Sequence, residues 1–424
     1  MNLNVRPLSR SRVRKVFRAC DVAQTQRLTP RWRARFHEEM NRTLGATAIA
    51  FLTACRGATD STPASTWIAL GASEAYTCGL SDTREALCWG GVGGYYDPPP
   101  LQDSLMPNSA VPVPVPGGRR FITITVGGLS MCALDSAHKA FCWGANQFGE
   151  VGDSSYLAKR GPSAVVGGHS WRMISSGGVH ACGVTLEGQT YCWGNQFRGG
   201  LGNGALDGAR AEPVGVLGGL TFGSVYAGLG TSCALTPEGE AYCWGINDYG
   251  ILGDSQTPEP NNESASLVRV VGGHRFASLA LGGNHACGLT QDAYVYCWGW
   301  NAYGQLGNGS MESSSSPVLV TGDLQWASVS VGYQHTCGLT TAGAAYCWGN
   351  NARGQFGTGV TDNSSSPQLI ADPGTYITIT AGGNHTCGLM ASGAAFCWGQ
   401  GNYGQLGDGV FRDRLRPTRV AGYE

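Results

Sequence analysis

The sequence is poor in charge, and above all in lysine. Only 13% of its 424 residues are charged, and lysine occurs three times, at Lys15, Lys139 and Lys159. Residues 1–55 hold 11 of the 28 basic and 3 of the 29 acidic residues, which leaves 17 basic and 26 acidic residues in 56–424. Because an acidic body lacks the basic footprint that a phosphate backbone requires, we expect no nucleic-acid partner.

The sequence also lacks the motifs of common enzyme and metal sites. It contains no Gly-x-Ser-x-Gly elbow, no P-loop, no His-Glu-x-x-His motif and no zinc-ribbon spacing. We therefore predict a protein that is not an enzyme, with no cofactor and no metal.

A short apolar run covers residues 44–54 (LGATAIAFLTA). Eleven residues are too few to span a bilayer, which needs about 20, but they suit the apolar region of a signal peptide. The run ends in Leu-Thr-Ala-Cys at 52–55, which resembles the lipobox of bacterial lipoproteins. The resemblance implies cleavage before Cys55 and lipidation of Cys55, and the alternative is a buried segment that ends in an ordinary cysteine.

These features divide the chain into four parts. Residues 1–39 are either a basic leader or the result of a mis-called start. The second interpretation arises because Met40 would give a more ordinary beginning. Residues 40–54 are the expected lipoprotein signal peptide, and 55–66 are the lipidated Cys and a polar tether. Residues 67–421 hold everything else.

In contrast to charge, glycine and cysteine are abundant, with 66 and 16 residues. Apart from Cys20 and Cys55, the cysteines fall into seven pairs of identical spacing, and each second cysteine precedes Trp-Gly. The pairs are Cys78 and Cys88, Cys132 and Cys142, Cys182 and Cys192, Cys233 and Cys243, Cys287 and Cys297, Cys337 and Cys347, and Cys387 and Cys397. The pattern marks an internal repeat of about 50 residues.

Each repeat is expected to form four short strands, which is one blade of a propeller. The even spacing of Cys337 and Cys347 puts both on one face of a hairpin, around a three-residue loop at 341–343 whose last residue favours glycine. Four repeats have glycine there, whereas Arg84, His138 and Ala293 require a different turn or strain. The sequence therefore predicts an all-β fold, a seven-bladed propeller of four-stranded antiparallel blades with one hairpin disulfide in each.

Two other residue sets were weighed as metal ligands. A histidine stands two residues before a cysteine in four repeats, at His180, His285, His335 and His385. Because the other repeats lack it and no fourth ligand is present, we favour disulfides and a turn-stabilising role, with a ring of ligands at one mouth of the channel as the alternative. Acidic or amide residues follow the Gly-x-Leu-Gly position in several repeats. One interpretation is a ring of calcium ligands; we favour the other, in which these side chains cap turns. They are Asp153, Asp254, Asp408, Asn203 and Asn308.

The order G-x-x-H-T-C-x-L…Y-C-W-G-x-N-x-x-G-Q-L-G-x-G resembles the regulator of chromosome condensation repeat. Matching stretches begin at Gly304, Gly354 and Gly404, and blade 1 departs most. The resemblance covers roughly residues 67–421 and implies a seven-bladed propeller of the beta-lactamase inhibitory protein II-like superfamily. It also implies guanine-nucleotide exchange and chromatin binding in the nucleus, as in the founding member of the family. These functions do not suit an exported acidic chain.

Departures from the repeat are the better candidates for function, because the ring does not need them. Aromatic and arginine side chains are frequent anchors of interfaces. The candidates are Tyr95, Tyr96, Phe148, Arg198, Tyr249, Trp300, Tyr303, Arg353 and Tyr403. The competing interpretation is that the aromatic ones pack the core of their own loops.

We therefore expect a monomeric, membrane-anchored or secreted module of the bacterial cell envelope that holds a protein or glycan on one propeller face. The alternatives are a structural envelope protein without a discrete ligand, or a propeller enzyme that acts on polysaccharide. The enzyme would require an acidic pair that converges on the channel, and the sequence does not indicate one.

Overall fold

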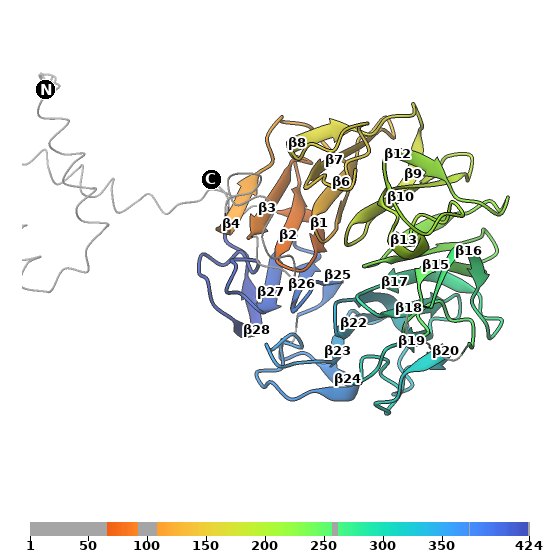
Figure 1. The fold of residues 1–424 in the computed structure, drawn as a ribbon. Helices are drawn as coiled ribbons and strands as arrows, with labels where there is room; N and C mark the ends of the chain where they lie inside the picture. The colour runs from red at the N-terminus through yellow and green to blue at the C-terminus, as the bar shows by residue number, and fades with distance from the viewer. Residues whose placement is uncertain (1–65, 92–107, 257–261, 373, 423–424) are drawn as a thin grey trace, which may run out of the picture. The chain divides into compact units, whose positions relative to one another are not determined.

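The computed structural model describes residues 66–91, 108–256, 262–372 and 374–422, within one compact unit, Ala64–Glu424. These residues form seven four-stranded antiparallel sheets arranged as the blades of a propeller (Figure 1). The leader, the signal peptide, Cys55 and the segment with Tyr95 and Tyr96 lie outside the described residues, so those predictions stay predictions.

Each blade consists of four consecutive strands. Blades 1 to 3 contain β1 (Trp67–Ala72), β2 (Tyr76–Ser81), β3 (Ala86–Gly90), β4 (Ser109–Pro114); β5 (Thr123–Val126), β6 (Ser130–Leu134), β7 (Ala140–Gly144), β8 (Lys159–Ala164); and β9 (Trp171–Ser176), β10 (His180–Thr185), β11 (Thr190–Asn195), β12 (Ala209–Gly215). Blades 4 and 5 contain β13 (Ser224–Ala227), β14 (Thr231–Leu235), β15 (Ala241–Ile246), β16 (Glu263–Arg269); and β17 (Phe276–Leu281), β18 (His285–Thr290), β19 (Val295–Gly299), β20 (Ser314–Leu319). Blades 6 and 7 contain β21 (Trp326–Val331), β22 (His335–Thr340), β23 (Ala345–Gly349), β24 (Ser364–Leu369); and β25 (Tyr376–Ala381), β26 (His385–Met390), β27 (Ala395–Gly399), β28 (Arg414–Arg419). One 3-10 turn, η1 (Phe197–Gly199), follows β11.

The first strand of each blade lies at the centre of the ring and the fourth lies at the outside. The last residues of all seven first strands line one common cavity, from Ala72 in β1 to Ala381 in β25. The middle two strands are almost wholly buried, as in β22, and the fourth strands are half-exposed. The predicted fold class is therefore confirmed, and residues 67–419 supply the strands of the seven blades.

The hairpin between the second and third strands of each blade has the predicted geometry. Cys337 lies directly opposite Cys347, their Cα atoms are 4.1 Å apart, and the same bridge forms in all seven blades. The last loop residue has a positive φ in each hairpin, including Arg84, His138 and Ala293, where a side chain makes that conformation costly. The three non-glycine repeats thus keep the common turn and carry strain.

The core is divided among the seven contacts between neighbouring blades. Each of the seven clusters of buried apolar residues joins two adjacent blades, as where Leu306 and Val320 of blade 5 pack with Trp326 and Trp348 of blade 6. The Trp348 indole covers Gly307 of the preceding blade, where any Cβ would come within 2.6 Å of its nitrogen. The tryptophan of each Cys-Trp-Gly therefore packs between blades.

The ring closes where blade 7 meets blade 1, which lie side by side in blue and orange in Figure 1. No strand among the described residues is exchanged between these blades, since each sheet holds its own consecutive strands. The Trp89 indole N–H donates to the carbonyl of Gln405 (2.9 Å), just as Trp398 donates to Gln355 (2.8 Å) one blade earlier. The closing contact therefore repeats the contact found elsewhere in the ring.

Seven disulfides are typical of a protein that resides in an oxidising, extracellular environment. Within the described part of the chain, no helix has the length and apolarity that crossing a bilayer requires.

Candidate functional site

One face of the ring carries the connections between the first and second strands and between the third and fourth strands of every blade. We call it the connection face, because an antiparallel four-strand meander puts these two connections at the same end. The two kinds meet directly, since the backbone N–H of Trp300 donates to the carbonyl of Asn284 (2.9 Å). The opposite face, which we call the hairpin face, carries the disulfide-bonded hairpins.

Seven of the nine predicted binding residues are described, and all seven lie on the connection face, in the loops between the third and fourth strands. Six occupy the same loop position of successive blades, namely Phe148, Arg198, Tyr249, Tyr303, Arg353 and Tyr403. Because each comes from a different blade, they are distributed around the ring and do not form one patch.

Buried glutamines fix the loop backbone at this position. The backbone N–H groups of Tyr303, Arg353 and Tyr403 each donate to the side-chain carbonyl of the glutamine two residues later, at 2.8–2.9 Å. These glutamines are fully buried. The side chains of Tyr303, Arg353 and Tyr403 therefore project from turns whose backbone is held in place.

The structure brings three of the predicted residues together. Trp300 lies between Tyr249 of blade 4 and Tyr303 of its own blade, with ring centroids 5.7 Å and 5.5 Å away. Tyr249 remains 40% exposed. We call these three residues the aromatic cluster, and it offers amphipathic rings to a partner at low entropic cost.

Arg198 lies beside this cluster but is held within the protein. Its guanidinium makes a two-pronged ion pair with Asp248 (2.7 Å) and a second pair with Glu263 (2.8 Å), and only 12% of its side chain is exposed. The hydrogen bonds to Asp248 raise the pKa of Arg198 above its usual value. Since both acids belong to blade 4, Arg198 joins blade 3 to blade 4.

Arg353 occupies the same position in blade 6 and is freer. Its guanidinium lies 3.5 Å from the carboxylate of Asp413, and 55% of its side chain is exposed. Arg353 is therefore available to a partner, whereas Arg198 is committed to the ring.

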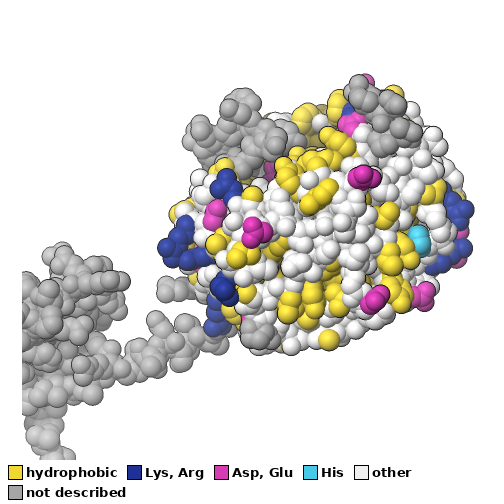
Figure 2. All heavy atoms as spheres, turned by 90° about the horizontal axis from the view of Figure 1, so that it is seen from below, with side chains coloured by type: hydrophobic (Ala, Val, Ile, Leu, Met, Phe, Trp, Pro, Cys, Tyr) yellow, Lys and Arg dark blue, Asp and Glu magenta, His cyan; other side chains and the backbone are white. Residues whose placement is uncertain are grey.

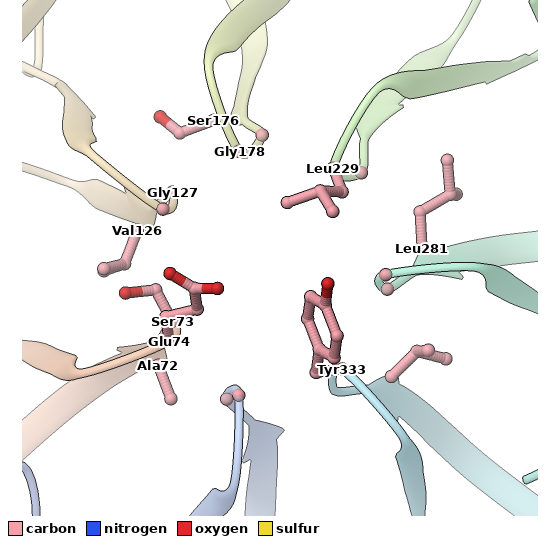
Figure 3. A pocket seen from close by; sticks show the side chains of 18 of the residues that line it. Ala72, Ser73, Glu74, Val126, Gly127, Ser176, Gly178, Leu229, Leu281 and Tyr333 are labelled. Atoms are coloured by element: carbon pink, nitrogen blue, oxygen red, sulfur yellow. The ribbon is translucent and has the colours of Figure 1, made fainter. Parts of the chain in front are cut away.

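The middle of the connection face is the mouth of the central channel, shown in Figure 3. The mouth is a cavity of about 100 Å³ between the seven first connections. Glu74, Leu229, Leu281 and Tyr333 are its largest side chains, and glycine and small residues fill most other positions. The sequence interpretation did not single out Glu74 or Tyr333, although both depart from the Gly-Gly of other repeats and the search for departures could have found them.

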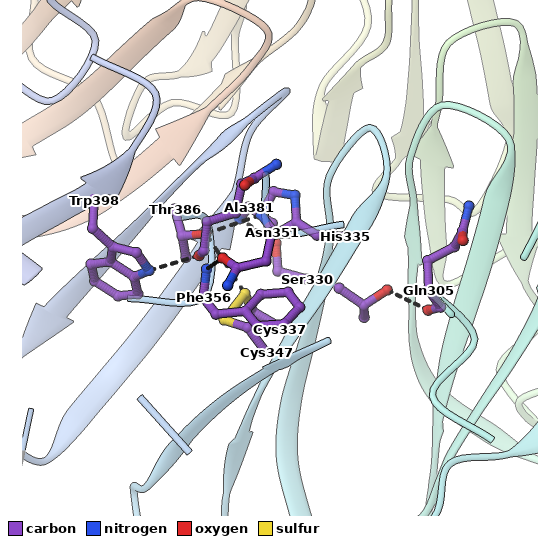
Figure 4. Close-up of a disulfide and its surroundings, with 12 residues drawn as sticks. Gln305, Ser330, His335, Cys337, Cys347, Asn351, Phe356, Ala381, Thr386 and Trp398 are labelled. Carbon is purple, nitrogen blue, oxygen red and sulfur yellow. Dashed lines mark hydrogen bonds between the residues drawn. A yellow bond between two sulfur atoms is a disulfide. The ribbon is translucent and has the colours of Figure 1, made fainter. Parts of the chain in front are cut away.

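The four histidines do not stabilise turns, and that expectation was wrong. Each imidazole Nε2 bonds a hydroxyl of the next blade at 2.8–3.0 Å, as His335 bonds Thr386 (Figure 4). The partners of His180, His285, His335 and His385 are Ser232, Thr336, Thr386 and Thr77. The three blades without the histidine face Met131, Ala181 and Ala286 at this position, which have no hydroxyl.

The hydrogen bonds around each hydroxyl determine the histidine tautomer. The Thr386 hydroxyl donates to the carbonyl of Gln355 (2.8 Å), which also accepts the Trp398 indole N–H. Having given its proton to the carbonyl, the hydroxyl can only accept from His335, so Nε2 carries the hydrogen. Nδ1 of His335 is buried without a partner, which suits the neutral ring.

Burial keeps these four histidines uncharged. All four side chains are at most 1% exposed. Desolvation lowers the pKa of His180 to about 4 and that of His285, His335 and His385 to about 3. They are buried structural links between blades, and they do not line the open mouth of the channel.

The acidic and amide residues after Gly-x-Leu-Gly cap turns, as favoured. Oδ1 of Asp153 accepts the N–H of Ser155 (3.1 Å), and the other four residues accept the N–H two residues later in the same way. Among the described residues, no group of three or more His, Cys, Asp or Glu side chains is arranged to hold a metal ion.

Figure 2 shows another side of the molecule, on which basic side chains gather only toward the edges. No continuous basic stripe crosses this face, which agrees with the charge balance of the sequence.

Comparisons with known proteins relate the whole propeller to one family. A family model described as the RCC1-like domain matches residues 74–424. The chain is 33% identical over 204 residues to the human E3 ubiquitin-protein ligase HERC2, which is 46% of this chain and 4% of HERC2. It is also 33% identical over 99 residues to the ultraviolet-B receptor UVR8 of Arabidopsis thaliana, which is 22% of this chain and 21% of UVR8. The chain thus spans only a small part of these relatives.

Solved structures share the fold. Yeast RCC1 (Prp20), in a crystal structure with Kap60, aligns with a TM-score of 0.66 at 20% identity, over 84% of this chain and 85% of its own. Human WBSCR16 aligns with a TM-score of 0.66 at 21% identity, over 74% of this chain and 84% of its own.

Proposed function

The chain belongs to the RCC1-like domain family, and from this premise we propose that it is a non-catalytic, extracytoplasmic binding module that holds a protein partner on its connection face. The observation that carries the proposal is the aromatic cluster of Tyr249, Trp300 and Tyr303. Aromatic side chains are enriched in protein interfaces.

Neighbouring side chains extend the apolar surface around the cluster. Phe197 in η1 is 56% exposed, and its neighbour Arg198 bonds Asp248, the residue before Tyr249. Phe197 and Tyr249 therefore flank an ion pair that is already satisfied within the chain. A partner that covers them buries apolar surface without leaving an unpaired charge.

Membership of the family supports a protein partner. Yeast RCC1 (Prp20) is known in a crystal structure with Kap60. That this relative binds a protein supports a protein partner here, whereas the individual partner does not carry over. Guanine-nucleotide exchange is not proposed for this chain.

The outer strands favour a monomer. In the fourth strand of each blade, one residue pairs with the second cysteine of the hairpin. The residue before it is proline in six blades and Leu267 in blade 4. The prolines are Pro112, Pro162, Pro213, Pro317, Pro367 and Pro417. Because proline has no N–H, it blocks strand addition at an exposed edge.

We further propose that lipid on Cys55 anchors the propeller to the envelope after export. Metabolic labelling with a lipid precursor should tag the wild-type protein, and Cys55→Ala should remove the tag. A labelled Cys55→Ala protein would overturn the anchor without affecting the binding proposal.

A matched pair of tyrosines tests the binding face. Tyr249 on the connection face is 40% exposed, and Tyr294 in a hairpin on the opposite face is 41% exposed. Full-length protein would be used to capture partners from envelope extracts, with Tyr249→Ala, Trp300→Ala and Tyr294→Ala in parallel. We expect a partner that wild type and Tyr294→Ala retain equally and that the other two variants lose.

Equal capture by all four proteins would contradict a role for the aromatic cluster. Capture that only Tyr294→Ala loses would move the binding surface to the hairpin face. Mass spectrometry identifies the retained protein in each case.

A further inference from the structure

The channel mouth is ringed by glycines because neighbouring blades approach closely there. The first residue after the inner strand is glycine in six blades, and a Cβ on Gly332 or Gly382 would collide with the carbonyl oxygen of the next blade. Blade 1 departs from this pattern with Ser73 and Glu74.

Among the described residues that line the mouth, Glu74 is the only charged one. Figure 3 shows its carboxylate and the phenol of Tyr333 pointing into the mouth from different blades. No lysine or arginine of the described chain forms an ion pair with Glu74. Burial raises the pKa of Glu74, as expected for a partly desolvated carboxyl without a cation.

The backbone of the mouth favours a ligand that donates hydrogen bonds. Five of the second residues of these connections already donate their N–H to a carbonyl of the next blade. These are Gly128, Gly178, Leu229, Tyr333 and Gly383. These five backbone donors are therefore already used, whereas the hydroxyls of Ser73 and Ser176, which also line the mouth, are buried without a partner. The fixed charge of the mouth comes from Glu74 and is negative, and this charge disfavours an anion.

The size of the cavity limits the ligand to one small group. A volume of about 100 Å³ holds roughly three waters, at about 30 Å³ each. Pockets for whole small-molecule ligands are several times larger, at about 300–1,000 Å³. The end of a single side chain fits the space.

We propose that the channel mouth binds one alkylammonium group, the end of a lysine side chain of the bound partner. The ammonium pairs with the Glu74 carboxylate and lies against the Tyr333 ring, an arrangement that combines an ion pair with a cation–π contact. This assignment rests on the proposed binding function of the connection face, and it gives the partner's chemistry at the centre of that face.

The test uses n-butylammonium chloride as the probe, with methyl-labelled leucine in the full-length protein observed by NMR. We expect the Leu229 methyl signals to shift and saturate in the millimolar range. Glu74→Gln should weaken binding roughly tenfold or more, as loss of a partly desolvated ion pair requires. Glu238→Gln, an exposed glutamate in a hairpin on the opposite face, should bind as wild type does.

Two further probes separate charge from shape. The neutral probe n-butanol should give no saturable shift, and neither should calcium chloride at equal ionic strength. Saturation by butanol, saturation by calcium, unchanged binding in Glu74→Gln or no saturation in wild type would each overturn the proposal. A thermal melt of Glu74→Gln that matches wild type shows that loss of binding is not loss of folding.

The outcome is independent of the capture experiment because the probe needs no partner. Probe binding without a captured partner would leave the cation site intact and contradict the module function. A captured partner without probe binding would contradict the cation site alone.

Discussion

Mild acid should destabilise the ring sharply, because four neutral histidines lie between its blades. Each donates Nε2–H to a hydroxyl and is almost completely buried. Protonation in place would put a second hydrogen on Nδ1, which His285, His335 and His385 bury without a partner. The folded state therefore resists protonation where the unfolded chain does not.

The sign and size follow from proton linkage. The folded pKa values of about 3 to 4 lie below the ordinary value of 6.5, so the stabilising contribution is full above pH 6.5 and is lost as the pH falls toward 3 to 4. Between pH 7 and pH 5, each histidine costs about 2 kcal/mol and four cost on the order of 8 kcal/mol, of which protonation of the buried Glu150, with a pKa of about 7, offsets about 2 kcal/mol. That loss is comparable with the whole stability of a typical domain, about 5–15 kcal/mol.

Guanidinium unfolding followed by tryptophan fluorescence measures this loss at pH 7.5, 6.5, 5.5 and 5. His335→Gln keeps a side-chain N–H donor and removes one titrating group, so the free energy lost between pH 7 and pH 5 should be smaller by about 2 kcal/mol. Thr386→Val is the matched control on the same hydrogen bond. It should lower the free energy of unfolding by about 1–3 kcal/mol at every pH, with the pH dependence unchanged.

Two results would refute the reasoning. One is a wild-type midpoint that stays constant between pH 7 and pH 5. The other is a His335→Gln protein with the full wild-type pH dependence, which would mean that His335 does not titrate differently in the two states.

Three further predictions concern single positions. Burial raises the pKa of Glu150 to about 7, and three other blades have glutamine at this position. Glu150→Gln should therefore raise the free energy of unfolding by about 3 kcal/mol at pH 8 and by little at pH 4.5. An unchanged guanidinium midpoint at pH 8 would contradict this. Replacing Cys337 and Cys347 together by alanine should lower the free energy of unfolding by about 2–3 kcal/mol. A variant whose guanidinium midpoint matches wild type would show that the bridge does not constrain the unfolded chain. Arg198→Ala should lower the free energy of unfolding by about 2 kcal/mol, because two ion pairs are lost. Arg353→Ala, at the same position of blade 6, should lower it by under about 1 kcal/mol. Equal losses in chemical unfolding would mean that the ion pairs of Arg198 do not hold blades 3 and 4 together.

The fold could be predicted from the sequence because its strongest signals are local. Two cysteines ten residues apart fix the register of a hairpin, and seven copies fix the number of blades. The turn-capping role of Asp153 was also readable, since its partner Ser155 is two residues away.

The contacts between blades could not be predicted, because their partners lie about 50 residues apart. The sequence places His335 near Cys337, which suggested a turn, yet its partner Thr386 belongs to the next blade. Arg198 likewise looked like an available anchor until its pairing with Asp248 was known. In each case the relevant neighbour follows from the rotation between blades, which no local pattern encodes.

The confinement of every disulfide to its own hairpin has a consequence for how the chain matures. Fourteen cysteines can pair in on the order of 10⁵ ways, so their oxidation is an opportunity for error. Here each correct partner is ten residues away across a tight turn. Loops of that length close in about 10–100 ns, long before distant thiols meet. Disulfide formation itself takes seconds or longer, but each thiol meets its own partner far more often than a distant one, so the hairpins favour the correct set of bridges.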